Sequence, residues 1–541
     1  MRWEILGSGD IIQTLLKNRG VIREKERQEF FNPTNPLKIS LKSFGISESE
    51  VKKAINRIKE AKKKGEHVVV YGDYDADGIT GTAILWETLH DVGIFVLPHI
   101  PDRFTEGYGL NPESIKKLKE KDPELGLIIT VDHGIVAGKK IDTAHKLGID
   151  VIITDHHQKG KVLPKSFAVV YTDKISGSAV SWVLSREISK AFKGSISKVD
   201  SGLELTAIGT IADQLPLIGI NRSIVKYGLG HLNKTTRPGL IELFRNAGVE
   251  KKTIGTYEIG FIVAPRINSM GRLEHAIDSL RLLCTRDRVK AFQIAKHITD
   301  TNSERQKIVE EVVLHARSKV GEDKIIVLAD EKYHEGVIGL AAARLVEEFY
   351  RPAIVLSKKG EVSKASARSI SGFNIIEAIR QLEDLYVEGG GHPMAAGFSI
   401  ETKKIDEFTS RINKIAKSLL TEEILSRKLK IDLELEFGAL DYKLLGHIKE
   451  FEPMGLGNPA PTFVSRNVSV IDVKTVGREA SHLKLRLKQD EQTFDAIFFG
   501  GGEMYSKLTP DSKVDIAYQL EDNSWNGYKN LQLKIKDIKI D

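Results

Sequence analysis

Three aspartates that alternate along a short loop are the first residues whose types and spacing could do chemistry. Asp73, Asp75 and Asp77 lie in the stretch 72–78, directly after an apolar run at 67–71. Alternate residues of an extended chain point to the same side, so these carboxylates crowd together. Such crowding costs free energy unless a cation neutralises the charges. The spacing therefore indicates a metal site; the alternative is a polar loop in which Asp77 caps the next helix.

Acidic and imidazole side chains recur at three further points. Asp132 follows one apolar run, where it could be a ligand or a helix cap, and Asp155, His156 and His157 follow the next run. Asp213 ends an apolar helical stretch, where a carboxylate is poorly placed for the helix dipole. Aspartate and histidine ligands without cysteine favour Mn²⁺ or Mg²⁺ over structural zinc. Two such ions about 4 Å apart could stabilise the attacking and leaving oxygens of a displacement at phosphorus.

The elements that must position these residues alternate between strands and helices. Short apolar runs predict strands, at 67–71, 94–97, 127–131 and 151–154. Helical spacing of apolar residues predicts helices over 79–92 and 137–147. This order implies an α/β fold with a parallel sheet covered on both faces. Ligands bind beyond the carboxyl ends of the strands in such sheets, so the polar clusters should converge on one crevice.

The rest of the chain predicts further parts. An α/β pattern returns with strands at 324–328 and 353–356, helices at 337–349 and 374–385, and a glycine-rich stretch at 389–392. Short alternating strands near the C-terminus predict a small barrel or sandwich, with strands at 482–487, 493–499, 513–518 and 530–535. The expected domains are an N-terminal extension (1–45), a catalytic domain (46–275), a helical connector (276–320), a second α/β domain (321–425) and an all-β domain (426–541).

The composition limits the function classes. A chain of 541 residues is too long for one hydrophobic core. The single cysteine, Cys284, excludes an intrachain disulfide framework and a cysteine-cage zinc site. No apolar stretch is long enough to span a membrane and the first residues lack a signal-peptide layout, so we expect a cytoplasmic protein. The net charge of +6 and the pI of about 8.9 only weakly favour polyanionic partners.

Five motifs, taken together and in order, resemble those of a known superfamily. They read YGDYDADGITGT from Tyr71, VDHGI from Val131, TDHH from Thr154, AIGTIADQLPL from Ala207 and GGGHPMAAGFS from Gly389. The first four are similar to the motifs of the DHH phosphoesterases, and the fifth resembles the signature of the DHH-associated domain. The N-terminal extension and the C-terminal all-β region, similar to an oligonucleotide-binding (OB) fold, extend the resemblance to the RecJ single-strand DNA exonucleases.

The resemblance implies roles for the residues that match these motifs. It implies metal ligands at Asp75, Asp77, Asp132, His156 and Asp213. His157 would contact the scissile phosphate, while Asp73 would support the ligand loop and Asp155 would orient neighbouring groups. Two departures from the family pattern are Tyr71, where several relatives carry a metal-binding histidine, and His133, where cysteine is common. An imidazole at His133 could join the site.

A second set of residues would hold the end of the substrate. The resemblance and the residue types together imply phosphate contacts at Arg103, Arg272, Ser366, Arg368, Ser369, Gly390, Gly391 and His392. Surface salt bridges for the arginines and a simple turn for the glycines are the alternatives. Trp525 and Tyr528, in an expected polar loop, could stack on bases.

The resemblance implies a 5′ to 3′ exonuclease that uses Mn²⁺ or Mg²⁺ (two ions), acts on single-stranded DNA and serves DNA repair and recombination. A single-strand-binding protein and a helicase are candidate partners. Two other functions stay open: another DHH phosphodiesterase that acts on RNA or oligonucleotides, and a non-catalytic nucleic-acid-binding scaffold. The filled acidic positions argue against the scaffold.

Overall fold

The computed structural model describes residues 1–250, 253–525 and 528–540, without the side chains of residues 524, 525 and 528. The chain forms two compact units. The larger unit consists of residues 40–213 and 228–427, and the smaller unit of residues 1–39, 214–227 and 428–541. Within the described ranges, none of the helices has the length and apolar character that crossing a bilayer requires.

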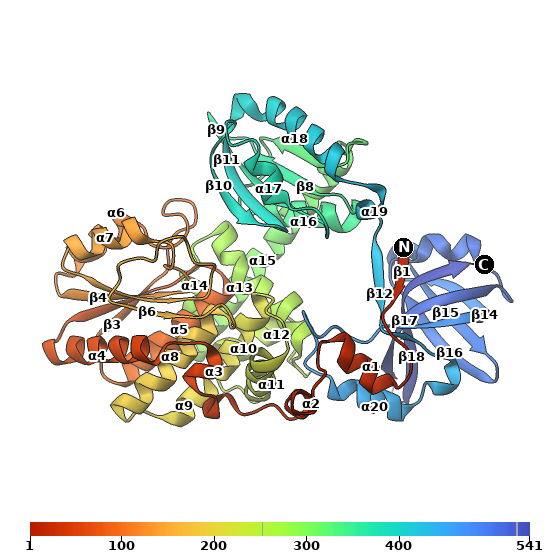
Figure 1. Ribbon diagram of the computed structural model, residues 1–541, viewed down its shortest axis with the longest axis horizontal. Helices are drawn as coiled ribbons and strands as arrows, with labels where there is room; N and C mark the ends of the chain where they lie inside the picture. Colours follow the sequence, from red (N-terminus) through yellow and green to blue (C-terminus); the bar gives the residue numbers. More distant parts are fainter. Residues whose placement is uncertain (251–252, 526–527, 541) are drawn as a thin grey trace. The chain divides into compact units, whose positions relative to one another are not determined.

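A five-stranded parallel sheet forms the first part of the larger unit (Figure 1). Its strand order is β3 (Val96–His99), β2 (His67–Tyr71), β4 (Leu125–Val131), β5 (Asp150–Asp155) and β6 (Ala168–Tyr171). All neighbouring strands run parallel, which confirms the predicted α/β class. The strand expected at 94–97 lies two residues later, and β6 was not expected.

Helices cover both faces of this sheet (Figure 1). One face packs against α6 (Pro112–Lys121) and α7 (Gly138–Lys146) through a cluster that includes Val69, Ile128 and Ile153. The other face is covered by α4 (Glu48–Lys64), α5 (Ala76–Asp91) and α8 (Gly177–Phe192). Alternate strand residues face opposite sides, so burial on both faces explains the continuous apolar runs.

Helices continue the larger unit beyond the sheet. They are α3 (Leu41–Phe44), α9 (Ile196–Ser201), α10 (Leu203–Ala212), α12 (Pro238–Asn246), the π-helical turn η2 (Glu258–Val263), α13 (Ala264–Leu273), α14 (Ile277–Cys284) and α15 (Arg288–Arg317). The last of these, α15, is a long helix of 30 residues within the expected connector, whereas α14 has only eight residues. A further helix, α11 (Gly219–Leu232), carries the chain from the smaller unit back into the larger one.

A mixed five-stranded sheet forms the second α/β part of the larger unit. Its order is β10 (Tyr386–His392), β11 (Ala395–Glu401), β9 (Val362–Arg368), β8 (Ala353–Ser357) and β7 (Ile326–Asp330). It packs with α16 (Ile338–Phe349), α17 (Ile375–Arg380) and α18 (Ile405–Leu419), and α19 (Glu422–Leu425) follows. The expected strands near 324–328 and 353–356 are confirmed. The helix predicted over 374–385 ends earlier in the structure, at Arg380, and the glycine-rich stretch lies on an edge strand rather than in the simple turn considered as an alternative.

The smaller unit contains the all-β part. A six-stranded sheet has the order β13 (Leu433–Glu434), β14 (Phe463–Val476), β15 (His482–Gln489), β16 (Gln492–Phe498), β18 (Tyr528–Ile540) and β17 (Lys513–Trp525). An additional pairing of β14 with β17 closes it into a barrel. The first strand, β1 (Arg2–Ile5), pairs with β12 (Lys428–Ile431), and α1 (Ile11–Asn18), α2 (Glu24–Phe31) and α20 (Tyr442–Glu450) complete the unit.

A fully buried arginine holds the segments of the smaller unit together. Arg222 donates hydrogen bonds to the main-chain oxygens of Phe30 and Phe451, at 2.7 and 2.8 Å. Its guanidinium also donates to the main-chain oxygens of Glu450, Glu452 and Pro453. Burial lowers the pKa of Arg222 to about 10. One side chain thus links three stretches that are far apart in the sequence.

Replacing Arg222 with methionine should destabilise the smaller unit by about 3 kcal/mol or more, because several buried carbonyls lose their donor. Differential scanning calorimetry would detect this as a lower melting temperature. The control, Arg23→Met, removes an exposed arginine of the same unit, whose guanidinium lies 3.9 Å from Glu26, and should change stability by less than about 0.5 kcal/mol. Equal melting temperatures for the two variants would contradict this account of Arg222.

Candidate metal centre and phosphate-binding residues

The aspartate loop after β2 is shaped by the start of α5. The carboxylate of Asp75 accepts hydrogen bonds from the main-chain nitrogens of Asp77 and Gly78, at 3.0 and 2.9 Å. Asp75 is therefore the N-cap of α5, and the alternative in which Asp77 caps this helix is wrong. The loop is also held from a distance, because the main-chain nitrogen of Ala76 donates to Asn268 Oδ1 at 2.7 Å.

Asp77 is held by the N-terminus of a different helix. Its carboxylate oxygens accept from the main-chain nitrogens of Gly177 (2.7 Å) and Ser178 (3.1 Å), in the first turn of α8. Free amides and the helix dipole stabilise a buried negative charge there. A Cβ atom at Gly209 of α10 would overlap Asp77 Oδ1 and Ser178 Oγ. The glycine in the fourth motif is therefore needed for close packing around Asp77.

Asp132 has a left-handed backbone, with φ 67°. Its main-chain nitrogen donates to the oxygen of Thr154 at 3.0 Å, and the hydroxyl of Tyr108 donates to its main-chain oxygen at 3.1 Å. Non-glycine residues rarely adopt this conformation and do so at a cost of about 1–3 kcal/mol. These contacts fix the direction of the Asp132 carboxylate at the end of β4.

His156 brings three distant carboxylates to one point. Its Nε2 lies 3.0 Å from Asp132 Oδ1, 3.5 Å from Asp213 Oδ2 and 3.9 Å from Asp77 Oδ2. Both His156 Nε2 and Asp132 Oδ1 are buried, and neither has a hydrogen-bond partner among the described residues. Buried polar atoms without partners are costly. Oxygen and imidazole donors that converge in this way fit a divalent cation.

The remaining aspartates of the first motif face the same region. Ligand atoms of Asp73, Asp75 and Asp132 lie within 4.8 Å of one another, as do those of the set Asp77, His156 and Asp213. The structure therefore brings all five expected ligands together, although they come from four separate motifs. Asp73, expected only to support the loop, also presents a carboxylate oxygen to this region.

Burial and the crowding of like charges raise the pKa values of several carboxylates in the cluster. Burial and the neighbouring charges of Asp77 and Asp75 raise the pKa of Asp213 to about 8. Burial first and the same two carboxylates next raise the pKa of Asp132 well above its ordinary value. For Asp73, burial and the charge of Asp75 raise the pKa in the same way. These carboxylates need a proton or a cation as a counter-charge.

Asp155 and His157 form a separate pair beside the cluster. Asp155 Oδ1 accepts from the main-chain nitrogens of His156 and His157 and from His157 Nδ1, at 2.7, 3.0 and 2.9 Å. Its other oxygen accepts from the main-chain nitrogen of Ile135 at 2.8 Å. Despite partial burial, the carboxylate of Asp155 raises the pKa of His157 to about 9. Asp155 thus orients His157 and keeps it protonated at neutral pH.

His133 and Tyr71 do not contribute to the cluster. His133 Nε2 donates to the main-chain oxygen of Tyr71 at 2.9 Å, and burial lowers the pKa of His133 to about 4. His133 belongs to none of the potential ion-holding groups among the described residues. The structure instead reveals two supporting residues that the sequence did not single out, Tyr108 and Asn268. Their partners lie 24 and 192 residues away, so no local pattern marks them.

Three arginines gather beside the aspartate loop. The Arg103 guanidinium lies over the ring of Tyr74, with 4.9 Å to the ring centroid. Burial, followed by the charges of Arg103, Arg305 and Arg368, lowers the pKa of Arg272 to about 9. Within the described ranges, none of Arg103, Arg272 and Arg368 forms an ion pair, so the alternative of surface salt bridges is not found. Unpaired, partly buried arginines suit an anionic ligand.

Residues of the second α/β part line up across its sheet. Ser366 of β9 is in register with Gly397 and, beyond it, Gly390 of β10. Arg368 is likewise in register with Ala395 and then His392. Arg368 Nη1 donates to Ser366 Oγ at 3.2 Å, and a Cβ atom at Gly339 of α16 would lie 2.9 Å from that oxygen.

Not every expected phosphate contact presents a free polar group. The hydroxyl of Ser369 donates to the main-chain oxygen of Phe373 at 2.6 Å and is buried. Gly391 lies on the exposed edge strand β10. Trp525 and Tyr528 pair across the β17–β18 hairpin rather than lying in a polar loop. Their side chains fall outside the described part of the structure.

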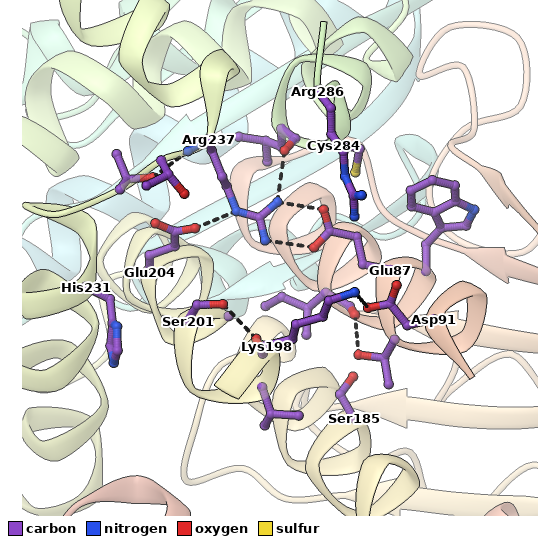
Figure 2. A pocket seen from close by; sticks show the side chains of 18 of the residues that line it. Glu87, Asp91, Ser185, Lys198, Ser201, Glu204, His231, Arg237, Cys284 and Arg286 are labelled. Atoms are coloured by element: carbon purple, nitrogen blue, oxygen red, sulfur yellow. Dashed lines mark hydrogen bonds and ion pairs between the residues drawn. The ribbon is translucent and has the colours of Figure 1, made fainter. Parts of the chain in front are cut away.

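A cavity of about 1270 Å³ lies elsewhere in the larger unit (Figure 2). It borders the C-terminal half of α5, whereas the aspartates lie at the N-terminal end of that helix. At its wall, Arg237 donates to both carboxylate oxygens of Glu87, at 2.6 and 2.7 Å, and to Glu204. These charges satisfy one another, and none of the predicted site residues lines the cavity.

The metal-free protein should lose thermal stability as the pH rises from about 6 to 9. The pKa values of Asp213 and His157 are raised to about 8 and about 9. A group whose pKa is higher in the folded state binds its proton more tightly there, which stabilises the fold at low pH. This contribution falls as the pH rises from the pKa of the unfolded state to that of the folded state, and it is absent at higher pH. Mn²⁺ should reverse the trend, because the cation takes the place of the protons.

Melting temperatures in EDTA and in Mn²⁺ across this pH range would check the expectation. Asp213→Asn should flatten the metal-free decline and reduce the gain from Mn²⁺, whereas Asp142→Asn on the exposed side of α7 should behave like the wild type. A stability gain from Mn²⁺ that is the same in Asp213→Asn would argue against an ion at this position.

Comparison with known proteins assigns the chain to a family. Three domain families match: the DHH family, N-terminal domain, over residues 67–210; the DHHA1 domain over 322–418; and the RecJ OB domain over 431–537. The single-stranded-DNA-specific exonuclease RecJ of Bacillus subtilis is 37% identical over 506 residues, which cover 91% of this chain. This chain spans 63% of the length of that relative.

RecJ of Thermus thermophilus is 32% identical over 496 residues, which cover 90% of this chain and 71% of the relative. The crystal structure of T. thermophilus RecJ in complex with Mn²⁺ superposes with a TM-score of 0.86 at 29% identity. That alignment covers 99% of this chain and 79% of the other. The fold agrees with that of this crystal structure, and the chain belongs to the RecJ family of DHH-domain exonucleases.

Proposed function

We propose that this chain is an exonuclease specific for single-stranded DNA. It would release 5′-mononucleotides in the 5′ to 3′ direction, using two divalent ions, Mn²⁺ or Mg²⁺, in DNA repair and recombination. The observation that carries the proposal is that two groups of side chains lie next to each other. One is the set of carboxylates around His156, in which ligand atoms lack hydrogen-bond partners, and the other is the set of arginines without ion pairs beside it. The names of its relatives, which are single-stranded-DNA-specific exonucleases, support the substrate class.

The metal ligands of the proposal are Asp75, Asp77, Asp132, His156 and Asp213. When bound, divalent ions supply charge neutralisation at the phosphate and a water of lowered pKa. Asp75 and Asp77 are fixed by amides of α5 and α8, so these carboxylates need no rearrangement to bind.

His157 is the proposed contact to the scissile phosphate. Asp155 holds its ring by Nδ1 and favours its protonated form, which leaves Nε2 to donate to a phosphate oxygen. Tyr108 Oη lies 3.4 Å from that nitrogen and limits the rotation of the ring. Asp155 and Asp73 act as positioning residues, because they orient His157 and the ligand loop.

The terminal 5′-phosphate would be held by Arg103, Arg272 and Arg368 together with Ser366. Guanidinium groups bind phosphate oxygens in pairs, and their mutual repulsion falls when the anion is present. Ser369, Gly390, Gly391 and His392 remain predictions for this site, as do Trp525 and Tyr528 for base stacking.

Two other functions remain to be tested against this one. Another DHH phosphodiesterase, acting on RNA or oligonucleotides, would share the metal cluster; the matched RecJ OB domain favours a DNA exonuclease. A non-catalytic scaffold is disfavoured because each acidic position of the four motifs carries a carboxylate. We further propose that the protein is cytoplasmic and that a single-strand-binding protein and a helicase are its partners. The division of the chain into five parts, given above, is also a proposal.

Digestion of DNA labelled at either end tests the proposal. A 5′-phosphorylated single strand should shorten from its 5′ end with Mn²⁺, and a duplex or a matched RNA should be degraded far more slowly. Asp77→Asn should reduce kcat by about 10³-fold or more, because the charge that binds the cation is lost. Shortening from the 3′ end, or undiminished activity of Asp77→Asn, would overturn it.

Loss of a terminal-phosphate arginine should remove the preference for phosphorylated ends. Arg368→Gln should lower kcat/KM for a 5′-phosphorylated strand by about tenfold or more, with a smaller effect on a 5′-hydroxyl strand. Arg411→Gln is a suitable control, because Arg411 is a surface arginine paired with Asp384 in the same α/β part. An equal loss on both substrates would argue against a terminal-phosphate role for Arg368.

A further inference from the structure

Three arginines outside the terminal-phosphate group come from three packed helices. Arg266 lies on α13, Arg305 on α15 and Arg344 on α16, and α15 packs against both other helices. Within the described ranges, neither Arg266 nor Arg305 forms an ion pair with a carboxylate. The Nε atoms of both are buried and lack a hydrogen-bond partner in the same part of the chain. Two buried donors without acceptors thus occur in one small region.

The helices hold these side chains without using up their donors. Arg266 Nη1 donates to the main-chain oxygen of Ile262 at 2.7 Å, one turn earlier. Arg305 Nη2 donates to Asn302 Oδ1 at 3.0 Å. Among the described residues, Arg344 forms an ion pair only with the exposed carboxylate of Glu347, at 3.6 Å. Each arginine is therefore oriented locally, while most of its N–H groups stay available.

The positive charges of Arg344 and Arg266 act on Arg305. Burial, then the charges of Arg344 and Arg266, lower the pKa of Arg305, and burial lowers that of Arg266. Buried charges without counter-charges are unfavourable. A bound anion would remove both the repulsion and the unsatisfied donors, which is what a guanidinium cluster offers a phosphate.

The cluster adjoins the terminal-phosphate group. Arg266 and Arg272 lie on the same helix, α13, and a Cβ atom at Gly339 of α16, the helix that carries Arg344, would lie 3.0 Å from Arg368 Nη2. The charge of Arg305 is also among those that lower the pKa of Arg272. Resting on the proposed function, we propose that Arg266, Arg305 and Arg344 form a second anion site that holds an internal phosphodiester of the single strand. A strand fixed at its terminal phosphate and at one internal phosphate would have a defined path past the metal cluster.

A scan of neutral linkages tests this site directly. The full chain loaded with Mn²⁺ would bind a fluorescent 5′-phosphorylated dT12 whose first linkage resists hydrolysis. Methylphosphonates would replace the other linkages one at a time, with Kd read by anisotropy. In the wild type, one or two internal positions should weaken binding about tenfold, because a charged contact is lost. In Arg305→Gln and Arg266→Gln the same replacements should change Kd less than about twofold.

The salt dependence gives a second readout. Each lost phosphate contact should reduce the slope of log Kd against log salt by about 0.7 for a single strand. Arg317→Gln is the matched control, because Arg317 lies on the same helix and pairs with Glu348; it should keep the wild-type scan and slope.

Several outcomes would overturn the second site. A flat scan in the wild type would do so without any variant, so misfolding of a variant cannot rescue the idea. The second site would also be overturned if a methylphosphonate at the same positions weakened binding to both variants as much as to the wild type. The same holds if polyglutamate displaced the DNA and replacing internal phosphates left Kd unchanged. A wild-type protein that leaves labelled DNA intact yet gives a position-specific scan would instead refute only the exonuclease proposal.

Discussion

Repulsion among buried carboxylates is the constraint on which the rest of this structure depends. Asp73, Asp77 and Asp132 are buried, and Asp75 lies half-buried close to them, where unneutralised charge is costly. The protein supplies part of the compensation itself. Main-chain amides at the start of α5 and α8 hold Asp75 and Asp77, and the helix dipoles act in the same direction. The remaining imbalance creates the affinity for a divalent cation.

Close approach of backbone segments makes this concentration of charge possible. A side chain at Gly177 would overlap the carboxylate of Asp132, and one at Gly209 would overlap that of Asp77. Glycine is thus required at these positions by packing around the carboxylates rather than by an unusual backbone angle. The partly buried arginines carry the opposite charge and lack carboxylate partners among the described residues, which would suit them to the phosphate groups that we propose as their ligands.

The sequence predicted the features that follow from topology. Carboxyl ends of parallel strands meet at one edge, so the polar residues after β2, β4 and β5 could be placed together without coordinates. It could not predict contacts across long separations, such as the amide of Gly177 on Asp77 or the amide of Ala76 on Asn268. Strand β9 escaped notice because its small and polar residues lack an apolar alternation, and β10 because glycine disfavours strands. Domain boundaries and the role of each ligand remain predictions.

The smaller unit is assembled from three stretches separated by hundreds of residues. Strand β1 pairs with β12, and Trp3 Nε1 donates to Asp537 at 2.8 Å, so the first residues pack against some of the last. During translation the N-terminal segment is therefore synthesised hundreds of residues before its partners, and it stays unpaired until they have been made. A chain that ended at residue 427 would leave α1, α2 and Arg222 without the residues that they pack against, so this unit cannot fold before its C-terminal stretch has been synthesised.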